Sequence, residues 1–283
     1  MSSIEELKIV RLYRAYNTVI QMCMDRGYTV RHPSAVAHAL LDPSVYNDEY
    51  GLDYEWFLQH FVVVQATPTA ASGAAGGEDD NATRVQTSHS KALEERRNWT
   101  LMRGAMRLVC SSEVVKSTND ESASLSKSGE KGGKSMLVFF SALPSLSMSE
   151  LQEFRDKALQ KQAHCMIVVS AGKITPVVRR GARELSGRLR AGTAEEIMSI
   201  QLFEEDELAY NIARHETVPS HVALSPEQAQ EFLQQRQISL SQLPRILNED
   251  PMVAYLGLVR GSIVRIQRES KESGPYEMYR QVI

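Results

Sequence analysis

The chain has 283 residues, of which 42% are hydrophobic and 24% are charged, a composition typical of a folded protein with one large or two medium domains. Its net charge of −3 excludes general nucleic-acid binding through bulk charge, so any such binding needs a local basic patch. Three cysteines at no metal-ligand spacing favour a reducing compartment such as the cytosol or nucleus, and no apolar stretch approaches the roughly 18 residues of a membrane span.

The N-terminus carries the pattern of a long helix. Ser3 and Glu6 have the spacing of a capping box, and Gly27 stands where a helix C-cap is expected. Between them, apolar residues recur at alternating spacings of three and four: Ile9, Leu12, Tyr16, Val19 and Cys23. We expect two further helices over residues 33–41 and 46–58, and a buried strand over 61–64.

Two low-complexity stretches follow, at about residues 67–90 and 111–135. The first is rich in Ala, Gly, Ser, Thr and Asp, and the second in Ser, Lys, Gly and Glu. Both hold too few apolar side chains to offset the entropy lost on ordering, so we interpret them as mobile surface insertions. The residues between them predict a strand over 99–110.

A strand–helix–strand unit comes next. The apolar run 136–140 predicts a core strand, and Ser147 and Glu150 then have capping-box spacing before a helix with an apolar stripe. A second strand is expected over 165–169. This order indicates a βαβ unit inside a mixed sheet.

A change of composition at about residue 207 follows an acidic stretch over 195–207. Beyond it, Ser225-Pro226-Glu227-Gln228 predicts a helix start. The chain then ends in a predicted hairpin with its turn at 273–275, in which Val264 and Ile266 face Tyr276 and Met278. We therefore expect an α+β fold with an N-terminal domain over 1–206, which carries both insertions, and a C-terminal domain over 207–283.

Three motifs suggest chemistry that their surroundings exclude. Residues 132–135 resemble the tail of a phosphate-binding loop, but the glycine needed five places before Gly133 is absent and a strand follows. Adjacent strand residues, such as His164 and Cys165, point to opposite faces and cannot share a site. His215 and His221 have no cysteine or carboxylate at ligand spacing, so we expect packing histidines bonded to the backbone. We expect no enzyme, no metal and no cofactor.

One basic segment, over residues 171–192, remains as a candidate binding site. Its six cations and the single acid Glu184 give a local charge of +5: Lys173, Arg179, Arg180, Arg183, Arg188 and Arg190. Three glycines and Pro176 predict that the segment is a loop. Arginines on a loop suit phosphate oxygens. The alternative is a solvated surface that pairs with the acids at 204–207.

The C-terminal block carries the matches that make the chain recognisable: His215, Glu216, Val218, Pro219, His221, Leu243, Pro244, Arg245, Ile246, Asp250, Pro251, Tyr255, Leu256, Gly257, Leu258, Arg260, Gly261, Ile266, Arg268, Ser273, Gly274, Tyr276, Tyr279 and Arg280. It closely resembles the H-type family of RNA polymerase subunits, which comprises the archaeal H-type subunit and the fifth subunit of eukaryotic nuclear polymerases. Residues 9–30 look like the opening helix of the eukaryotic form, and residues 173–176 match its Ile-Thr-Pro loop.

The resemblance implies a non-catalytic subunit of DNA-directed RNA polymerase in the nucleus, or in the nucleolus if it serves polymerase I. In the family, the C-terminal domain docks on the largest subunit beside neighbouring small subunits. The N-terminal domain forms part of the jaw around downstream DNA, with a fold similar to that of certain nucleases without their catalytic residues. Sequence-independent contacts with the duplex backbone are then expected from the segment's candidates: Lys173, Thr175, Pro176, Arg179, Arg180 and Arg183.

Several motif residues also have a local explanation. Asp250 and Pro251 are typical of a helix start, Gly257 of a helix end, and Arg260-Gly261 of a turn, so these residues are predicted to be scaffold, with an exposed hairpin edge as the docking surface. The two insertions and the glutamines that follow Pro226 depart from the family and favour a divergent paralogue dedicated to one polymerase class. An adaptor with the same fold outside the polymerase is the alternative.

Overall fold

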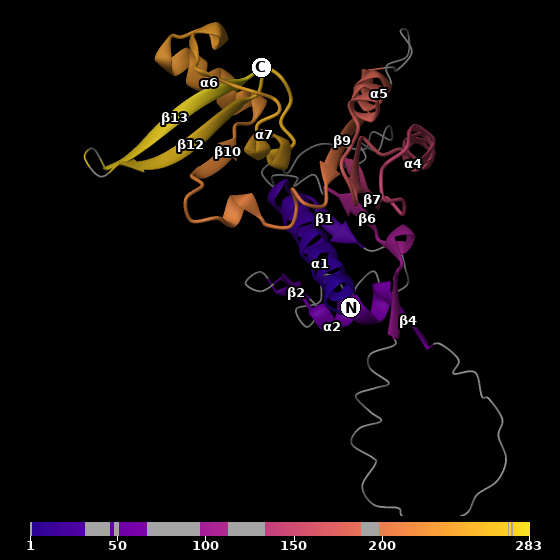
Figure 1. Cartoon of the computed structure of the whole chain (residues 1–283). Coiled ribbons are helices and arrows are strands. Elements are labelled where there is room, and N and C mark those ends of the chain that lie inside the picture. The colour runs from indigo at the N-terminus through magenta and orange to yellow at the C-terminus, as the bar shows by residue number, and fades with distance from the viewer. Residues whose placement is uncertain are drawn as a thin grey trace, which may run out of the picture.

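The computed structural model describes residues 2–31, 46–47, 51–66, 97–112, 134–187, 198–270, 272 and 274–283. Within these ranges the protein is α+β with two main sheets, as predicted (Figure 1). The insertion at 67–90, residues 113–133 of the second insertion and the helix expected over 33–41 lie outside the described residues. None of the described helices is long and apolar enough to cross a lipid bilayer.

The elements before residue 206 are α1 (Ser2–Asp25), β1 (Thr29–Arg31), β2 (Tyr46–Asn47), β3 (Gly51–Leu52), α2 (Tyr54–Phe61), β4 (Val62–Ala66), β5 (Arg97–Leu101), the 3-10 helix η2 (Arg103–Ala105), β6 (Arg107–Ser111), β7 (Ser135–Phe140), α4 (Met148–Gln160), β8 (Cys165–Ser170), α5 (Pro176–Gly187) and β9 (Ser199–Glu204). Those after it are η3 (Ile212–Arg214), β10 (Ser220–Ala223), α6 (Pro226–Arg236), η4 (Leu240–Gln242), β11 (Arg245–Ile246), α7 (Pro251–Leu256), β12 (Ile263–Ser270) and β13 (Gly274–Val282).

The predicted long helix is α1. All five residues of its predicted stripe, from Ile9 to Cys23, are buried. Gly27, with a φ of +80°, stands just beyond the end of the helix, where a left-handed conformation favours glycine. The helix begins at Ser2, one residue before the cap expected at Ser3, so the helical path starts earlier than the capping pattern indicated.

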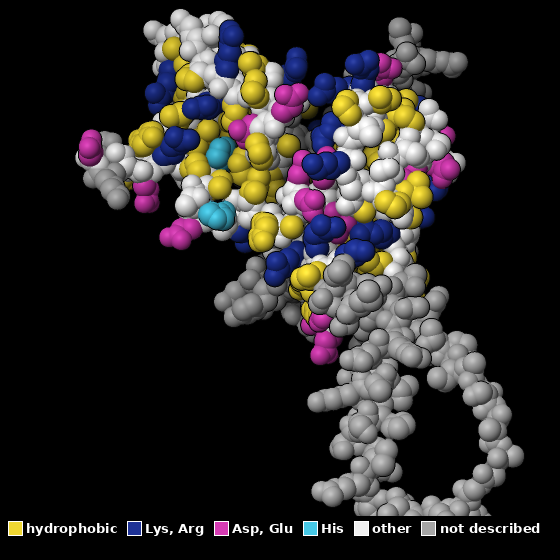
Figure 2. Space-filling model, in the orientation of Figure 1, with side chains coloured by type: hydrophobic (Ala, Val, Ile, Leu, Met, Phe, Trp, Pro, Cys, Tyr) yellow, Lys and Arg dark blue, Asp and Glu magenta, His cyan; other side chains and the backbone are white. Residues whose placement is uncertain are grey.

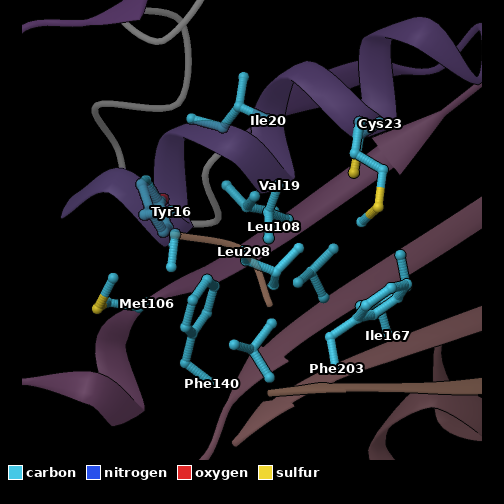
Figure 3. Close-up of a cluster of buried hydrophobic side chains, with 14 of the residues drawn as sticks. Tyr16, Val19, Ile20, Cys23, Met106, Leu108, Phe140, Ile167, Phe203 and Leu208 are labelled. Carbon is cyan, nitrogen blue, oxygen red and sulfur yellow. The ribbon is translucent and has the colours of Figure 1, made fainter. Parts of the chain in front are cut away.

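The first sheet is five-stranded with the order β1-β6-β7-β8-β9. Strands β7 and β8 are parallel and joined through α4, which confirms the predicted βαβ unit in a mixed sheet. One face of the sheet packs against α1, where Tyr16, Leu108, Phe140 and Phe203 meet in one buried cluster (Figure 3). The other face is covered by α4 and α5 through Phe154 and neighbouring apolar residues.

Two predictions before residue 111 are wrong, and a third, the strand at 61–64, is confirmed as a strand but not as a fully buried one. Residues 46–58 are not one helix, because β2 and β3 pair as a short hairpin and α2 starts only after Asp53, whose carboxylate accepts from the amide of Trp56. The strand expected over 61–64 is β4, displaced to 62–66, and Val63 is 42% exposed, so it is not a fully buried strand. The strand expected over 99–110 is divided into β5 and β6, because the backbone turns through η2 between them.

The second sheet is four-stranded with the order β10-β12-β13-β11. The predicted hairpin is β12–β13, with Ile266 opposite Met278 as expected and Tyr276 opposite Arg268. Gly274, placed in the turn by the sequence, begins β13. The hairpin edge is less open than predicted, because β10 pairs with part of β12 and β11 with the end of β13. A small core of its own holds this sheet together, around Val253, Val264 and Ile266.

The two sheets are joined through α1, which lies between them in Figure 1. Leu208, Met252 and Tyr255, from the C-terminal third of the chain, belong to the same buried cluster as the inner face of α1. The C-terminal third therefore has a core of its own and also completes the core of the N-terminal part.

Candidate subunit and nucleic-acid interfaces

Residues 176–187 of the basic segment form the helix α5 and not the loop that the sequence predicted. Thr175 accepts a hydrogen bond from the amide of Val178 at its side chain, 3.5 Å, and one from Arg179 at its carbonyl, 3.1 Å, so it occupies the N-cap position. Pro176 is the first helical residue, where its missing amide costs no hydrogen bond. Gly181 lies inside the helix, where the terminal methyl of the flexible Met148 side chain of α4 would be 2.5 Å from a Cβ.

The six candidate residues differ in what they contact. Arg179 lies 2.7 Å from the carboxylate of Glu204, and Arg183 lies 3.1 Å from that of Glu249. The pairing of Arg179 with the acidic stretch is the alternative that the sequence left open. Lys173 and Arg180 are exposed and have no ion pair within the described part of the chain.

The candidates therefore form a short exposed surface at the start of α5. Thr175 and Pro176 are exposed beside Lys173, and Figure 2 shows Lys and Arg side chains gathered over this end of the molecule with acidic side chains among them. Arg188 and Arg190 lie outside the described residues. Among the described cations of the segment, Lys173 and Arg180 form no ion pair with a carboxylate. They can therefore contact phosphate oxygens without first breaking an ion pair.

Part of the C-terminal motif is scaffold, as predicted. The Asp250 carboxylate accepts from the amides of Met252, 2.9 Å, and Val253, 3.4 Å, and Pro251 is the first residue of α7. Gly257 ends α7 with a φ of +66°. The turn at Arg260-Gly261, with a φ of +93° at Gly261, leads into β12 as expected.

Other motif residues hold the second sheet together from its surface. The carbonyls of Pro244 and Arg245 accept hydrogen bonds from β13, the second of them from the Arg280 side chain at 3.5 Å. The Tyr279 ring stacks on Phe232 of α6, with ring centroids 4.0 Å apart. This stack and the complete capping box between Ser225 and Gln228 explain how α6 is held although none of its residues is buried.

Four motif residues are exposed and free to meet a partner. Arg245, Arg260, Arg268 and Tyr276 are all exposed, and Gly274 has a φ of +72° at the tip of the hairpin. Because β11 covers only the end of β13, most of that strand's outer edge is open among the described residues. An open strand edge with exposed arginine and tyrosine suits a protein interface.

The histidines take structural contacts. His221 Nδ1 lies 2.6 Å from the Pro219 carbonyl, and His215 Nδ1 lies 2.9 Å from the Thr217 hydroxyl. His164 Nδ1 accepts from the amide of Ser135. The prediction of backbone-bonded histidines is confirmed for His221 and also for His215, whose Nδ1 accepts from the Thr217 amide at 3.3 Å, but His215 is exposed and not packed. In the ranges that the structure describes, no group of three His, Cys, Asp or Glu side chains is placed to hold a metal ion.

Comparison with known proteins gives two kinds of match. The family model for the C-terminal domain of RNA polymerase Rpb5 matches residues 210–282. A Dictyostelium discoideum protein named DNA-directed RNA polymerases I, II, and III subunit rpabc1 is 35% identical over 146 residues, which cover 52% of this chain and 71% of that protein. The protein of the same name from Caenorhabditis briggsae is 30% identical over 148 residues, covering 52% of this chain and 66% of that protein. The chain belongs to the Rpb5 family of RNA polymerase subunits.

Family membership confirms the resemblance found in residues 215–280 and supports the prediction that the chain is not itself an enzyme. The family match begins at residue 210, six residues after β9 ends at Glu204 and before β10 starts at Ser220. In this Rpb5-family chain, the matched region therefore contains the whole of the second sheet.

Sequence reasoning missed the residues that join this region to α1. Arg26 donates to the carbonyls of Tyr255 and Ala254, both at 2.8 Å, and so satisfies the end of α7. The Tyr255 hydroxyl donates to Asp25 at 2.6 Å and accepts from Asn211 at 3.2 Å. Burial, followed by the bond to Asp25, raises the pKa of Tyr255 well above its ordinary value. Tyr255 therefore forms its contacts with other residues of the same chain. No local sequence signal could reveal hydrogen-bond partners so distant in sequence.

A second missed group lies at the end of β9. Glu205, one of the acids at 204–207, has a fully buried side chain. Its carboxylate lies 2.7 Å from Arg103 and 3.4 Å from Arg11. The adjacent Asp206 is exposed and pairs with Arg11 at 2.8 Å. The acidic stretch thus ties α1, η2 and β9 together.

Proposed function

We propose that the chain is a structural, non-catalytic subunit of DNA-directed RNA polymerase in the nucleus. Its C-terminal domain, over 207–283, docks on the largest subunit beside neighbouring small subunits. Its N-terminal domain, over 1–206, forms part of the jaw beside downstream double-stranded DNA. The observation that carries the proposal is family membership, since the relatives from Dictyostelium discoideum and Caenorhabditis briggsae are named as subunits of RNA polymerases I, II and III.

Docking through the C-terminal domain is supported by the division of its motif into two groups. Asp250, Pro251 and Gly257 shape the domain from within, whereas Arg268 and Tyr276 are exposed near the tip of the hairpin, along an open edge of β13. Exposed arginine and tyrosine are enriched at protein interfaces. We therefore assign the docking surface to the open edge of β13, with Arg245 on the adjacent β11; the exposed motif residues His215 and Arg260 are further candidates for contact with a partner.

A jaw role for the N-terminal domain is supported by the start of α5. Lys173 and Arg180 are the strongest candidates for contact with phosphates, because neither is held by a carboxylate within the described residues. Thr175 and Pro176 lie between them on the same surface. Arg179 and Arg183 contribute less, because each first has to leave a glutamate. A nuclease-like fold without catalytic residues is consistent with core strands β7 and β8, which carry no charged side chain.

The first test is affinity purification of the tagged full chain followed by sedimentation. We expect it to co-migrate with a large assembly that contains a largest polymerase subunit. Migration as a free protein would favour the adaptor alternative. The glutamine-rich α6 and the two insertions support a divergent paralogue dedicated to one class, with a nucleolar location if that class is polymerase I. Equal recovery of the largest subunits of all three polymerases would refute that dedication.

The second test measures DNA retention by purified polymerase that carries variants of this chain. Loss of one phosphate contact lowers the slope of log binding constant against log salt by about 0.9. We expect such a change for Arg180→Ala and a smaller one for Arg179→Ala. Lys161→Ala, an exposed cation beyond the end of α4, is the charge-matched control and should leave the slope unchanged. An unchanged slope for Arg180→Ala would count against the jaw contact.

A further inference from the structure

Strand β9 forms an edge of the first sheet within the part of the chain that the structure describes. Its odd-numbered residues form hydrogen bonds with the β8 side. The amide of Ser199 donates to the carbonyl of His164 at 3.0 Å, and the amide of Glu205 donates to the carbonyl of Ser170 at 2.9 Å. Because alternate residues of a strand direct their amides and carbonyls to opposite sides, those of Ile200, Leu202 and Glu204 point away from β8. The outer side of β9 thus offers three amides to a neighbour.

Two of these three amides are already occupied by the protein itself. The Ile200 amide donates to the Ser186 hydroxyl of α5 at 3.1 Å, and the Glu204 amide donates to the Glu207 carboxylate at 3.0 Å. The Leu202 amide, between them, has no partner among the described residues. Closure of both ends of the edge leaves room for one short strand segment, centred on Leu202.

A cavity of about 490 Å³ lies along this open edge. All of residues 200–203 line it, with Ala182 of α5 on one side and Pro251 and Ala254 of α7 on the other. In Figure 1, α5 and β9 stand opposite α7 across this space. The cavity is therefore a cleft between the sheet that precedes residue 206 and the domain that follows it.

The lining of the cleft is mostly apolar but holds one unsatisfied acceptor. The Gln201 Oε1 atom is buried and has no hydrogen-bond donor in the described structure. Leu208 and Leu258 provide apolar contacts, and Tyr210 lines the cleft with 71% of its surface exposed. A free strand amide beside apolar side chains and an exposed aromatic ring suits a polypeptide, which supplies carbonyl acceptors and apolar side chains together.

The charges around the cleft disfavour nucleic acid as its occupant. Arg179 and Arg183 line it, but both are paired with glutamates, and Glu207 and Glu249 line it as well. The lining charges balance, so no net attraction for phosphates remains. The Arg183–Glu249 pair links α5 to the residue before Asp250, and both side chains are 73% exposed, so solvent screening makes this pair easy to separate.

We propose that the cleft binds an extended segment of another polymerase polypeptide. The segment pairs with the backbone of Leu202 as a short added strand and places an apolar side chain between Leu208 and Leu258. This surface is separate from the open edge of β13 assigned above. The identity of the partner as a polymerase subunit rests on the proposed function.

Hydrogen exchange tests the added strand directly, on the full wild-type chain alone and within purified polymerase. We expect exchange at the Leu202 amide to slow by roughly tenfold or more in the assembly, because an added strand would hydrogen-bond it. The amides of Ile200 and Glu204, already bonded in the free chain, should change much less. Equal exchange at Leu202 in both samples would overturn the proposal. A chain that never enters the polymerase would instead refute the proposed function.

A photo-crosslinker at Tyr210 tests the kind of partner in the same purified polymerase. We expect it to join a defined peptide of another subunit, whereas a crosslinker at Leu7, an exposed α1 residue, should not join that peptide. Crosslinking to DNA, or to no other polypeptide, would overturn the proposal. Leu202→Pro removes the open amide without touching the bonds to β8 and should abolish the Tyr210 crosslink, whereas Leu202→Ala should retain it. If the proline variant does not fold, the wild-type measurements still decide.

Discussion

The C-terminal domain meets the rest of the molecule in two places that differ in burial. At the first, Arg26 and Tyr255 bring the end of α1 and the end of α7 into one hydrogen-bonded and apolar joint. At the second, Arg183 and Glu249 bridge the cleft with an ion pair that is open to solvent on both sides. The difference indicates that the joint fixes the C-terminal third to α1, whereas the ion pair across the cleft is easy to separate.

The largest expected effect comes from removing the centre of the joint. Tyr255→Ala deletes a ring that is 3% exposed and its bonds to Asp25 and Asn211, and it should lower the free energy of unfolding by about 3–5 kcal/mol. Urea denaturation measures the change. Tyr276→Ala is the matched control, since that ring is 39% exposed in the same domain. Equal effects of the two substitutions would show that the joint does not stabilise the fold.

A smaller loss is expected at the guanidinium of the joint. Arg26→Met keeps an unbranched apolar stem but removes the two hydrogen bonds to the α7 carbonyls. Bonds to charged groups contribute about 1.5–3 kcal/mol, so we expect a loss of about 2–3 kcal/mol in the same denaturation experiment. Arg107→Met, at an exposed position on β6, should change the stability by less than about 0.5 kcal/mol.

The next effect concerns the glycine that faces Arg26. Gly257→Ala places a Cβ about 2.9 Å from the Arg26 guanidinium carbon at a φ of +66°. A left-handed conformation costs a residue with a Cβ roughly 1–2 kcal/mol, and we expect a loss of that size. Gly104→Ala is the control, because nothing lies within 4 Å of a Cβ there. A neutral Gly257→Ala would mean that Arg26 moves aside without loss.

The smallest effect is expected at the cleft. Arg183→Ala and Glu249→Ala remove an ion pair with both side chains 73% exposed, and a double-mutant cycle should give a coupling of about 0.5 kcal/mol or less. A coupling well above 1 kcal/mol would contradict the comparison. It would mean that the ion pair across the cleft contributes to the free energy of unfolding on a scale comparable with the contacts of Tyr255.

The start of α5 shows where sequence reasoning failed although the signal was present. Thr175-Pro176 has the same cap-then-proline order that correctly predicted helices at Ser225-Pro226 and Asp250-Pro251. Three glycines nearby favoured a loop instead. Gly181 nevertheless lies inside the helix with its Met148 neighbour on α4, and this contact leaves no trace in the local sequence.

Much of what the sequence determined by itself depends on neighbours within a few residues. The buried stripe of α1, the capping box at Ser225 and the ends of α7 follow from side-chain periodicity and from backbone groups that need a local partner. The family resemblance likewise rests on a continuous C-terminal block.

Only the tertiary structure decided which charges are available for binding. Arg11 and Glu205 are 194 residues apart, and Asp25 and Tyr255 are 230 residues apart, yet each pair is in contact. In the sequence, Glu205 and Asp206 are equivalent acids, as Arg179 and Arg180 are equivalent bases. Packing buried Glu205 and paired Arg179, while Asp206 and Arg180 stayed exposed, because burial depends on chain segments that meet only after folding.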